Sequence, residues 1–289
     1  MNSLRRGYAM VLMLIGSIVI SFGGLIVRNI ETADNWQINF YRSIAFGTAI
    51  SIVLLLRYGK TGLQQFKGIG LQGVWAAMLL ACASISFLQA ITNTTVAATT
   101  FTLSSIPFLT AIMAWLFLGE RIGKSTVSTM LVAAAGISLM FIQGLGSGTL
   151  YGNFMAFLCA IGFSSYAIII RRNRRTEMLP TLILSNLIIV LVALIFSWDN
   201  LLISWSDLLL CFVLGGVLSA TVNTLFIIAS KHLFAAELTL FMLLEFTLGP
   251  IWVWIFANEV PTFWTLIGGS IVVSAVLLKS LSELRKVNI

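Results

Sequence analysis

The chain has 289 residues, of which 59% are hydrophobic and only 9% are charged, and its formal net charge at pH 7 is +7. A soluble domain carries about 25% charged residues, so the composition excludes an ordinary soluble domain, and it excludes a disordered chain for the same reason. The three cysteines, all within apolar stretches, exclude a disulfide scaffold.

Long unbroken apolar runs predict an all-α integral membrane protein, because a transmembrane barrel shows short alternating segments instead. A bilayer core about 30 Å thick needs roughly 20 apolar residues per helix, and this length predicts ten spans joined by short connections. The first span is expected to be a retained helix, since it is longer than a signal-peptide core. The predicted spans are Tyr8–Val27, Trp36–Leu56, Leu71–Ile91, Thr95–Leu118, Ser125–Ile142, Tyr151–Ile170, Pro180–Phe196, Asp207–Ser230, Leu238–Ala257 and Phe263–Leu281.

The lysines and arginines predict the orientation. With ten spans and an internal N-terminus, fifteen of the 17 lie at the inner side, whereas Arg28 lies in an outer loop and Arg42 within a span. This asymmetry predicts a bacterial inner (plasma) membrane protein with both termini cytoplasmic. The same asymmetry explains the positive net charge, because basic residues at the inner side face the anionic surface of the lipid bilayer. We expect no nucleic-acid partner, since the basic run at 171–175 has no aromatic residues on which bases could stack.

Two segments resemble each other and predict an internal repeat. The segment VAATTFTLSSIPFLTAIMAWLFLGE begins at Val96, and AAELTLFMLLEFTLGPIWVWIFANE begins at Ala235. A gapless alignment places Glu120 on Glu259, and the predicted halves are residues 1–147 and 148–289, with five spans each. Because five is odd, the second half enters the membrane from the opposite side. Inverted repeats with a substrate site near the midplane are a plan of secondary transporters.

Several of these segments resemble the EamA family of the drug/metabolite transporter superfamily. They are the helix endings LFLGE and IFANE, the segment FYRSIA around Arg42, and Leu244-Glu245-Phe246, where Phe246 stands in place of the family's usual proline. Asn258 likewise replaces a glycine. The resemblance implies a ten-helix bundle around a central cavity, lined mainly by spans one, three, four, six, eight and nine. It implies cargo such as amino acids, nucleosides or amines, and no cofactor.

Glu245 is the most informative polar residue, because it lies about 12 Å into span nine, where a charge costs roughly 3 kcal/mol. Two interpretations stay open: a cation-binding or proton-carrying group, or an interhelical hydrogen bond. Arg42 is a structural or coupling candidate that could snorkel outward, cap a helix end or pair with Glu245, although span two is not expected to line the cavity. Pro107 and Pro250 are candidate hinges. The other candidate cavity residues are Gln89, Asn93, Phe101, Ser105, Tyr166, Asn223 and Phe241.

The main alternative is an integral-membrane enzyme or lipid-modifying protein, and a channel or structural subunit is a third possibility. The single histidine, His232, lies beside Lys231, and the sequence contains neither a pair of carboxylates on one membrane face nor a P-loop. We therefore expect no enzyme and no metal site. The expected function is secondary transport, as an exporter, of small organic metabolites by alternating access at a midplane cavity. Proton-coupled and uncoupled transport both stay open, as do a monomer and a weak dimer.

Overall fold

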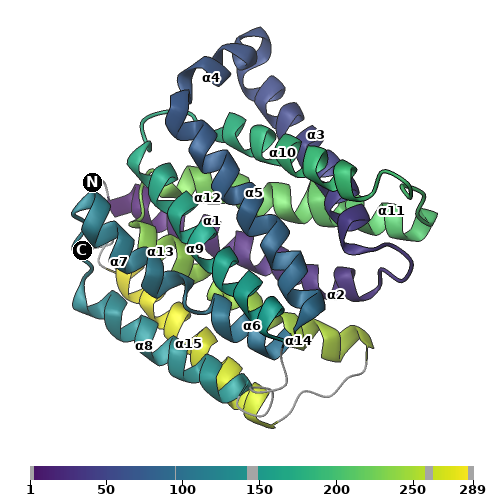
Figure 1. Ribbon diagram of the computed structural model, residues 1–289. Coiled ribbons are helices and arrows are strands. Elements are labelled where there is room, and N and C mark those ends of the chain that lie inside the picture. Colours follow the sequence, from purple (N-terminus) through teal and green to yellow (C-terminus); the bar gives the residue numbers. More distant parts are fainter. Residues whose placement is uncertain (1–2, 95, 142–148, 258–262, 286–289) are drawn as a thin grey trace.

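The structure is a computed structural model that describes residues 3–94, 96–141, 149–257 and 263–285, and within these ranges the chain forms only helices and connecting turns (Figure 1). The helices are α1 (Ser3–Ser21), α2 (Gly23–Arg28), α3 (Asn35–Tyr58), η1 (Gly59–Thr61), α4 (Gly62–Gly68), α5 (Gly70–Asn93), α6 (Val96–Leu103), α7 (Ile106–Leu118), α8 (Lys124–Phe141), α9 (Leu150–Arg172), α10 (Leu179–Phe196), α11 (Trp205–Phe212), η2 (Val213–Ser219), α12 (Ala220–Ser230), α13 (Ala235–Phe241), α14 (Leu243–Ala257) and α15 (Phe263–Arg285).

The all-helical membrane fold predicted from composition is confirmed. Among the described residues, nine helical segments are long and apolar enough to cross a membrane, and they correspond to predicted spans one to four and six to ten. The fifth predicted span is α8, whose apolar stretch Lys124–Met140 is shorter, so the count of ten remains a prediction. The predicted span ends Thr95 and Ile142, and also Asn258 and Glu259, lie outside the described residues.

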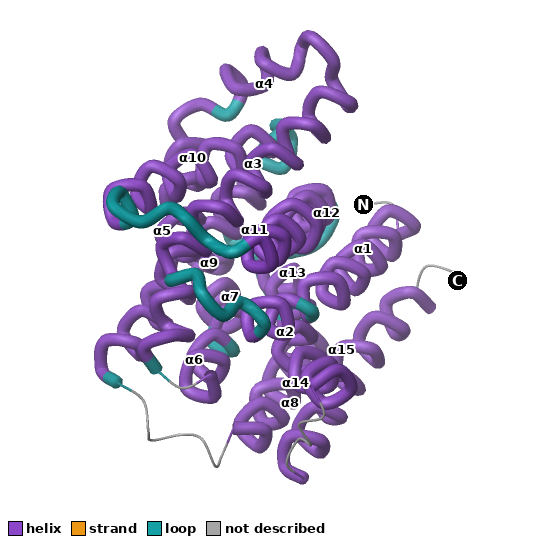
Figure 2. Tube along the Cα trace, turned by 90° about the vertical axis from the view of Figure 1, so that its right-hand side faces the viewer, coloured by secondary structure: helices purple, strands orange, loops and turns teal. Residues whose placement is uncertain are grey.

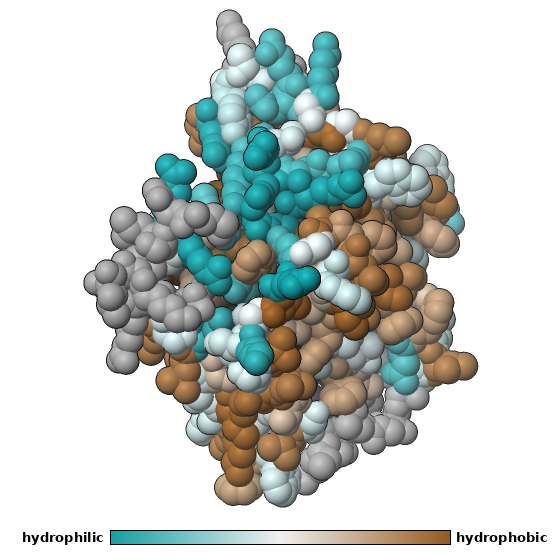
Figure 3. Space-filling view, turned by 90° about the vertical axis from the view of Figure 1, so that its left-hand side faces the viewer, coloured by the Kyte–Doolittle hydropathy of each residue, from teal (hydrophilic) through white to brown (hydrophobic). Residues whose placement is uncertain are grey.

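One end of the bundle, here called the basic end, brings together the N-terminus and the turns that were predicted to lie inside. It is defined by the contacts of Arg6 with Glu237, Arg171 with Glu120, and Lys279 with Ser125. Figure 3 views the face that carries the N-terminus and shows hydrophilic side chains gathered over its centre and upper part. Large apolar side chains are exposed along the helices, among them Leu56 at 83%, as expected of a surface that faces lipid.

At the opposite end, two loops lie side by side (Figure 2). Asp207, which is 1% exposed at the start of α11, holds the loop between α2 and α3. Its carboxylate accepts hydrogen bonds from the backbone N–H groups of Thr32 at 2.9 Å, Ala33 at 3.1 Å and Glu31 at 3.3 Å, and from the Thr32 hydroxyl. Its backbone N–H in turn donates to Ser204 Oγ at 3.2 Å, which caps the start of α11.

Helices α8 and α15 pack along each other at one side of the bundle (Figure 1). A Cβ atom at Gly268 would lie 2.2 Å from the carbonyl oxygen of Gly136, so the two backbones approach at a distance that only glycine permits. Close contact through small residues is typical of helix packing in membranes, where dispersion and not the hydrophobic effect holds helices together. Predicted spans five and ten thus form a pair of their own.

Two of the spanning segments are interrupted in the middle, and only the first interruption lies beside a predicted hinge. Span four ends as α6 at Leu103 and resumes as α7 at Ile106, directly before Pro107, as Pro in the first turn of a helix favours. Span nine breaks at Met242, between α13 and α14. The break therefore lies eight residues before Pro250, which is inside α14, and its position was not predicted.

We predict that Asp207→Asn lowers the free energy of unfolding by about 2 kcal/mol, because buried backbone donors lose a charged acceptor. The measurement is thermal unfolding of the purified protein in detergent. Asp199→Asn, at an exposed position in the turn after α10, is the matched control and is expected to leave the transition unchanged. Equal transitions for Asp207→Asn and the unsubstituted protein would contradict the stabilising role of this loop anchor.

Candidate functional site

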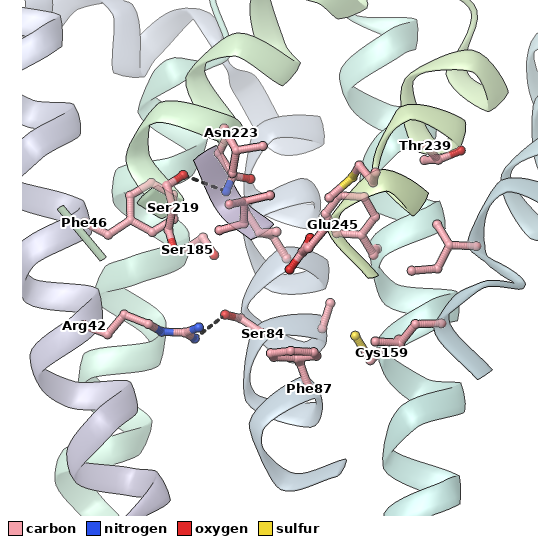
Figure 4. Close-up of a pocket in the computed structure, with 18 of the residues that line it drawn as sticks. Arg42, Phe46, Ser84, Phe87, Cys159, Ser185, Ser219, Asn223, Thr239 and Glu245 are labelled. Atoms are coloured by element: carbon pink, nitrogen blue, oxygen red, sulfur yellow. Dashed lines mark hydrogen bonds between the residues drawn. The ribbon is translucent and has the colours of Figure 1, made fainter. Parts of the chain in front are cut away.

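A cavity of about 160 Å³ lies in the middle of the bundle. Its walls come from both predicted halves, and Figure 4 shows side chains from several helices converging on it. The lining is largely apolar with a small number of polar groups, which is typical of small-molecule sites. The residues that line it are Ile20, Arg42, Phe46, Leu80, Ala83, Ser84, Phe87, Leu103, Ile106, Cys159, Phe163, Ser185, Asn186, Ile189, Ser219, Val222, Asn223, Thr239, Met242, Leu243, Glu245 and Phe246.

The cavity is lined by more helices than the sequence led us to expect. The expectation that span two stays away from it is wrong, because α3 contributes Arg42 and Phe46. Span seven also takes part, through Ser185, Asn186 and Ile189 of α10. The first four spans of each predicted half therefore reach the cavity, whereas the pair α8 and α15 contributes none of the lining residues.

Arg42 lies on α3 and is 9% exposed, so its guanidinium is enclosed by protein instead of snorkelling to the surface. Its Nη2 donates to Ser84 Oγ at 2.7 Å on α5 and to Asn39 Oδ1 at 3.0 Å one turn earlier on α3. Both hydrogen bonds use the same nitrogen. Within the described part of the chain, no carboxylate forms an ion pair with this guanidinium.

Glu245 lies in the first turn of α14, immediately after the break at Met242. Its backbone N–H donates to the Met242 carbonyl at 3.1 Å, which is the short spacing of a tight first turn. The positive end of a helix dipole favours a carboxylate at this position. The side chain points into the cavity, on another side from Arg42 (Figure 4), and in the described ranges the two do not form an ion pair.

Of the remaining candidates, the structure brings only Asn223 to the cavity, where its Nδ2 donates back to the Ser219 carbonyl at 3.0 Å. Gln89 and Asn93 lie at the end of α5 opposite the basic end, and Asn93 Nδ2 donates to the Gln89 carbonyl at 2.8 Å. Ser105 closes the turn between α6 and α7 by donating to the Thr102 carbonyl at 2.6 Å. All three lie outside the lining and form hydrogen bonds within their own chain segment.

The aromatic candidates also lie elsewhere. Tyr166 is fully buried and stacks on Phe226, with ring centres 6.0 Å apart, and Phe241 is 2% exposed in the same apolar core cluster. Phe101, on α6, is 37% exposed at the outside of the bundle. These three rings therefore do not line the cavity; its aromatic lining residues are Phe46, Phe87, Phe163 and Phe246.

The sequence analysis missed the polar residues Ser84, Ser185 and Asn186. Single serines are common in membrane helices and bond to their own backbone, so they carried no signal. Asn186 does this here, with Nδ2 donating to the Leu182 carbonyl at 2.8 Å. An asparagine inside the apolar run 179–196 was the one available clue, since an amide is costly in lipid and faces inward.

A π-helical turn, η2, lies beside the cavity and sets the position of Arg42. A Cβ atom at Gly215 would lie 2.0 Å from the Arg42 carbonyl oxygen, so α3 and η2 touch backbone to backbone. At the neighbouring Gly216, the nearest atom is the Ala45 carbonyl oxygen at an ordinary 3.5 Å. π-turns inside helices are frequent at functional sites, and this one carries Ser219 into the cavity wall.

Residues 7–142 match the model of the EamA-like transporter family. The resemblance to the EamA family is confirmed. The matched segment extends from α1 to the end of α8, with Ile142 outside the described residues, and it includes Arg42 and the whole first-half wall of the cavity. The apolar helices make this chain a multi-pass membrane protein, and its residues 7–142 are similar to a family of transporters.

Other comparisons extend over more of this EamA-like chain. It is 26% identical over 254 residues to the pseudopaline exporter CntI of Pseudomonas aeruginosa strain PAO1, which covers 84% of this chain and 85% of that exporter. The exporter of the same name from strain UCBPP-PA14 matches equally. A crystal structure with 16% identity superposes with a TM-score of 0.75 over 96% of this chain and 99% of the other, which shows a shared fold.

We predict that Gly215→Ala destabilises this EamA-like protein by about 1–3 kcal/mol, the usual cost of forcing an extra methyl into a filled space. Gly216→Ala is the matched control at the next position and is expected to be within about 0.5 kcal/mol of the parent. Thermal unfolding in detergent measures both. A larger loss for Gly216→Ala than for Gly215→Ala would contradict the packing of η2 against Arg42.

Proposed function

We propose that the protein is a secondary transporter that exports small organic metabolites from the bacterial cytoplasm by alternating access at the central cavity. The observation that carries this proposal is the cavity itself, which is lined by both predicted halves and contains a buried arginine and a glutamate in an otherwise apolar wall. The EamA-like match and the similarity to the pseudopaline exporter of Pseudomonas aeruginosa support it. The inner membrane is the expected location, with both termini cytoplasmic.

Two inverted five-helix repeats, residues 1–147 and 148–289, are part of the proposal. In the gapless alignment of the two halves, Met242 corresponds to Leu103 and Glu245 to Ile106, so the breaks of spans four and nine fall within about one position of each other. All four residues line the cavity. Interrupted helices at corresponding positions are a recurrent sign of the substrate site of inverted-repeat transporters.

An ionic cluster at the basic end joins the two halves and supports alternating access. Glu120 of the first half accepts a hydrogen bond from Arg171 Nε at 2.7 Å and from the Ala235 backbone N–H at 3.2 Å. Arg171 Nη1 also donates to the Ser230 carbonyl at 2.7 Å. Arg6 of the first half pairs with Glu237 at 2.6 Å. These links hold α9 and α13 of the second half against the first, and Arg171 also connects α9 to the end of α12.

The cluster lies on the path from the cavity to the basic end. Glu237 precedes Glu245 by eight residues in the same span, which places it about 12 Å nearer the basic end. The side chains of Arg171 and Glu237 are only 2% and 3% exposed, and both Arg6 and Arg171 lie 5.6 Å from the ring centre of Phe234. We interpret the cluster, Arg6, Glu120, Arg171, Phe234 and Glu237, as an inner gate, closed in this conformation.

The enzyme interpretation finds less support. Over the described ranges, no three His, Cys, Asp or Glu side chains come together as a candidate metal site. Glu245 is the only carboxylate among the lining residues, whereas general acid–base catalysis commonly uses two groups in different protonation states. A carboxylate in a transport cavity can instead bind a cationic group of the cargo or carry a proton, as polar groups within membrane spans often do.

We predict that Glu245→Gln abolishes most export while leaving the protein folded and inserted. Metabolites in medium and cytosol are profiled for cells that produce the parent, Glu245→Gln or neither. One compound class is expected to accumulate outside only with the parent. Glu31→Gln, at an exposed loop position, is the control and is expected to export normally.

Normal export and an unchanged pH dependence in Glu245→Gln would discard the proton or cation role. A profile in which no solute moves but a lipid or a covalent product changes would favour the enzyme interpretation instead.

We further predict that opening the inner gate exposes the cavity to the basic end. Cys159 lines the cavity, so Cys82→Ser and Cys211→Ala leave it as the single reporter thiol. In inside-out vesicles, Glu120→Gln combined with Glu237→Gln is expected to speed its modification by an impermeant maleimide at least about tenfold, since breaking one buried ion pair costs about 3–5 kcal/mol. Glu31→Gln is again the control. An unchanged rate in the double variant would contradict the gate.

A further inference from the structure

The two charged side chains in the cavity wall have unused hydrogen-bonding groups. Arg42 forms both of its hydrogen bonds through Nη2, so within the described residues its Nη1 and Nε donors have no protein acceptor. The oxygens of Glu245 receive no side-chain donor in the same part of the chain. Each group lies in the lining of one shared cavity, and neither neutralises the other (Figure 4).

An enclosed charge without a counter-charge is costly, because moving an ion out of water loses several kcal/mol that only a close partner repays. Arg42 cannot escape this cost by releasing its proton, since arginine stays charged in proteins. A direct pair between Arg42 and Glu245 would satisfy both, but the two approach the cavity from α3 and α14 without meeting. A ligand that carries both charges would satisfy them together.

The wall around Arg42 fits an anionic group. Besides the free guanidinium donors, it contains the hydroxyl of Ser185, which is fully buried and has no hydrogen-bond partner among the described residues. The guanidinium is held in place by Ser84 and Asn39, so little rotational freedom remains to be lost on binding. Guanidinium groups bind carboxylates through paired, charge-assisted hydrogen bonds.

The wall around Glu245 fits a cationic group. Among the residues that the structure describes, no lysine or arginine other than Arg42 lines the cavity. Asn223 directs its Nδ2 to the Ser219 carbonyl, which leaves its Oδ1 as an additional acceptor near this wall. An ammonium group offers three donors and needs acceptors of this kind. Between the two walls, Phe46, Phe87 and Phe163 provide apolar surface.

We propose that the cavity binds an organic zwitterion, with its anionic group against Arg42 and Ser185, its cationic group against Glu245 and Asn223, and an apolar body between the phenylalanine rings. This inference rests on the proposed function and specifies its substrate class. It assigns Arg42, which lies on a span that was not expected to line the cavity, to recognition of the anionic end.

The test uses purified full-length protein in nanodiscs and sets of three related ligands. Each set consists of a free zwitterion, its N-acetyl derivative, which retains only the anionic group, and its methyl ester, which retains only the cationic group. The zwitterions are apolar amino acids, dipeptides and N-monoalkylated amino acids, each of which has an N–H that the acetyl group can replace. Binding is measured by thermal stabilisation and then by titration. At least one free zwitterion is expected to bind about tenfold or more tightly than either derivative, as expected for loss of one charge-assisted contact.

Substitutions assign each end. In Arg42→Gln the free zwitterion and its methyl ester are expected to bind within about twofold of each other, because the guanidinium that donates to the anionic group is gone. Discrimination against the N-acetyl derivative is expected to persist. In Glu245→Gln the free zwitterion and its N-acetyl derivative are expected to bind similarly, whereas discrimination against the methyl ester persists. Arg42→Lys retains the charge and is expected to restore part of the discrimination against the ester, which a merely structural role of Arg42 would not do.

Failure of every free zwitterion to bind the parent protein would overturn the inference, as would binding that survives both blocking groups equally. If Arg42→Gln and Glu245→Gln each lost discrimination against both the ester and the N-acetyl derivative, the assignment of the two ends of the ligand would be overturned. Because binding is measured without transport, the two proposals fail separately. Export of a metabolite that has a single charge would refute this inference alone, and zwitterion binding without any export would refute the proposed function alone.

Discussion

Within a lipid bilayer, every backbone N–H and C=O must find its hydrogen-bond partner inside the protein. This constraint explains why the described chain is helical throughout, and it makes any interruption of a spanning helix costly. The interruptions therefore occur where protein supplies replacement partners. At the break in span nine, the Phe241 carbonyl accepts a hydrogen bond from Ser17 Oγ at 2.8 Å. At the break between α1 and α2, Ser21 Oγ donates to the Ile18 carbonyl at 2.6 Å and accepts from Trp252 Nε1 at 2.7 Å. Phe22 stacks on the same indole, with ring centres 4.2 Å apart.

The breaks also determine what the cavity can offer. An intact span nine would place Glu245 in the middle of a helix, with the backbone donors beneath it already used. The break at Met242 instead makes Glu245 part of a helix start, where the helix dipole favours its negative charge. The contact of Gly215 with the Arg42 backbone positions the other charged side chain of the cavity, since it fixes the helix that carries Arg42. Local backbone irregularities thus position both charged groups.

The contrast between the two pairs of charges follows from their surroundings. At the basic end, Arg171 and Glu120 meet directly and are supported by backbone groups, so their attraction offsets the loss of water. In the cavity, Arg42 and Glu245 stay apart and retain unused donors and acceptors. A direct ion pair suits a contact that holds two halves together, whereas separated charges suit a site that a solute occupies.

Composition and periodicity alone predicted the helical membrane fold, the asymmetry of the basic residues and ten spans, nine of which are confirmed among the described residues. They could do so because length and polarity are local properties that lipid selects directly. The motifs around Arg42 and Glu245 were sufficient to recognise the family. Most of the residues that line the cavity, in contrast, could not be predicted from the sequence. Tyr166, Phe241 and Gln89 looked equally suitable as lining residues, and Ser84 and Ser185 carried no signal. Only the tertiary structure decided among them, because the rotation of each helix about its axis depends on contacts with segments far away in the chain. Arg42 shows this most clearly: a glycine 173 residues later allows the approach that sets its place, and nothing in the neighbouring sequence reveals it.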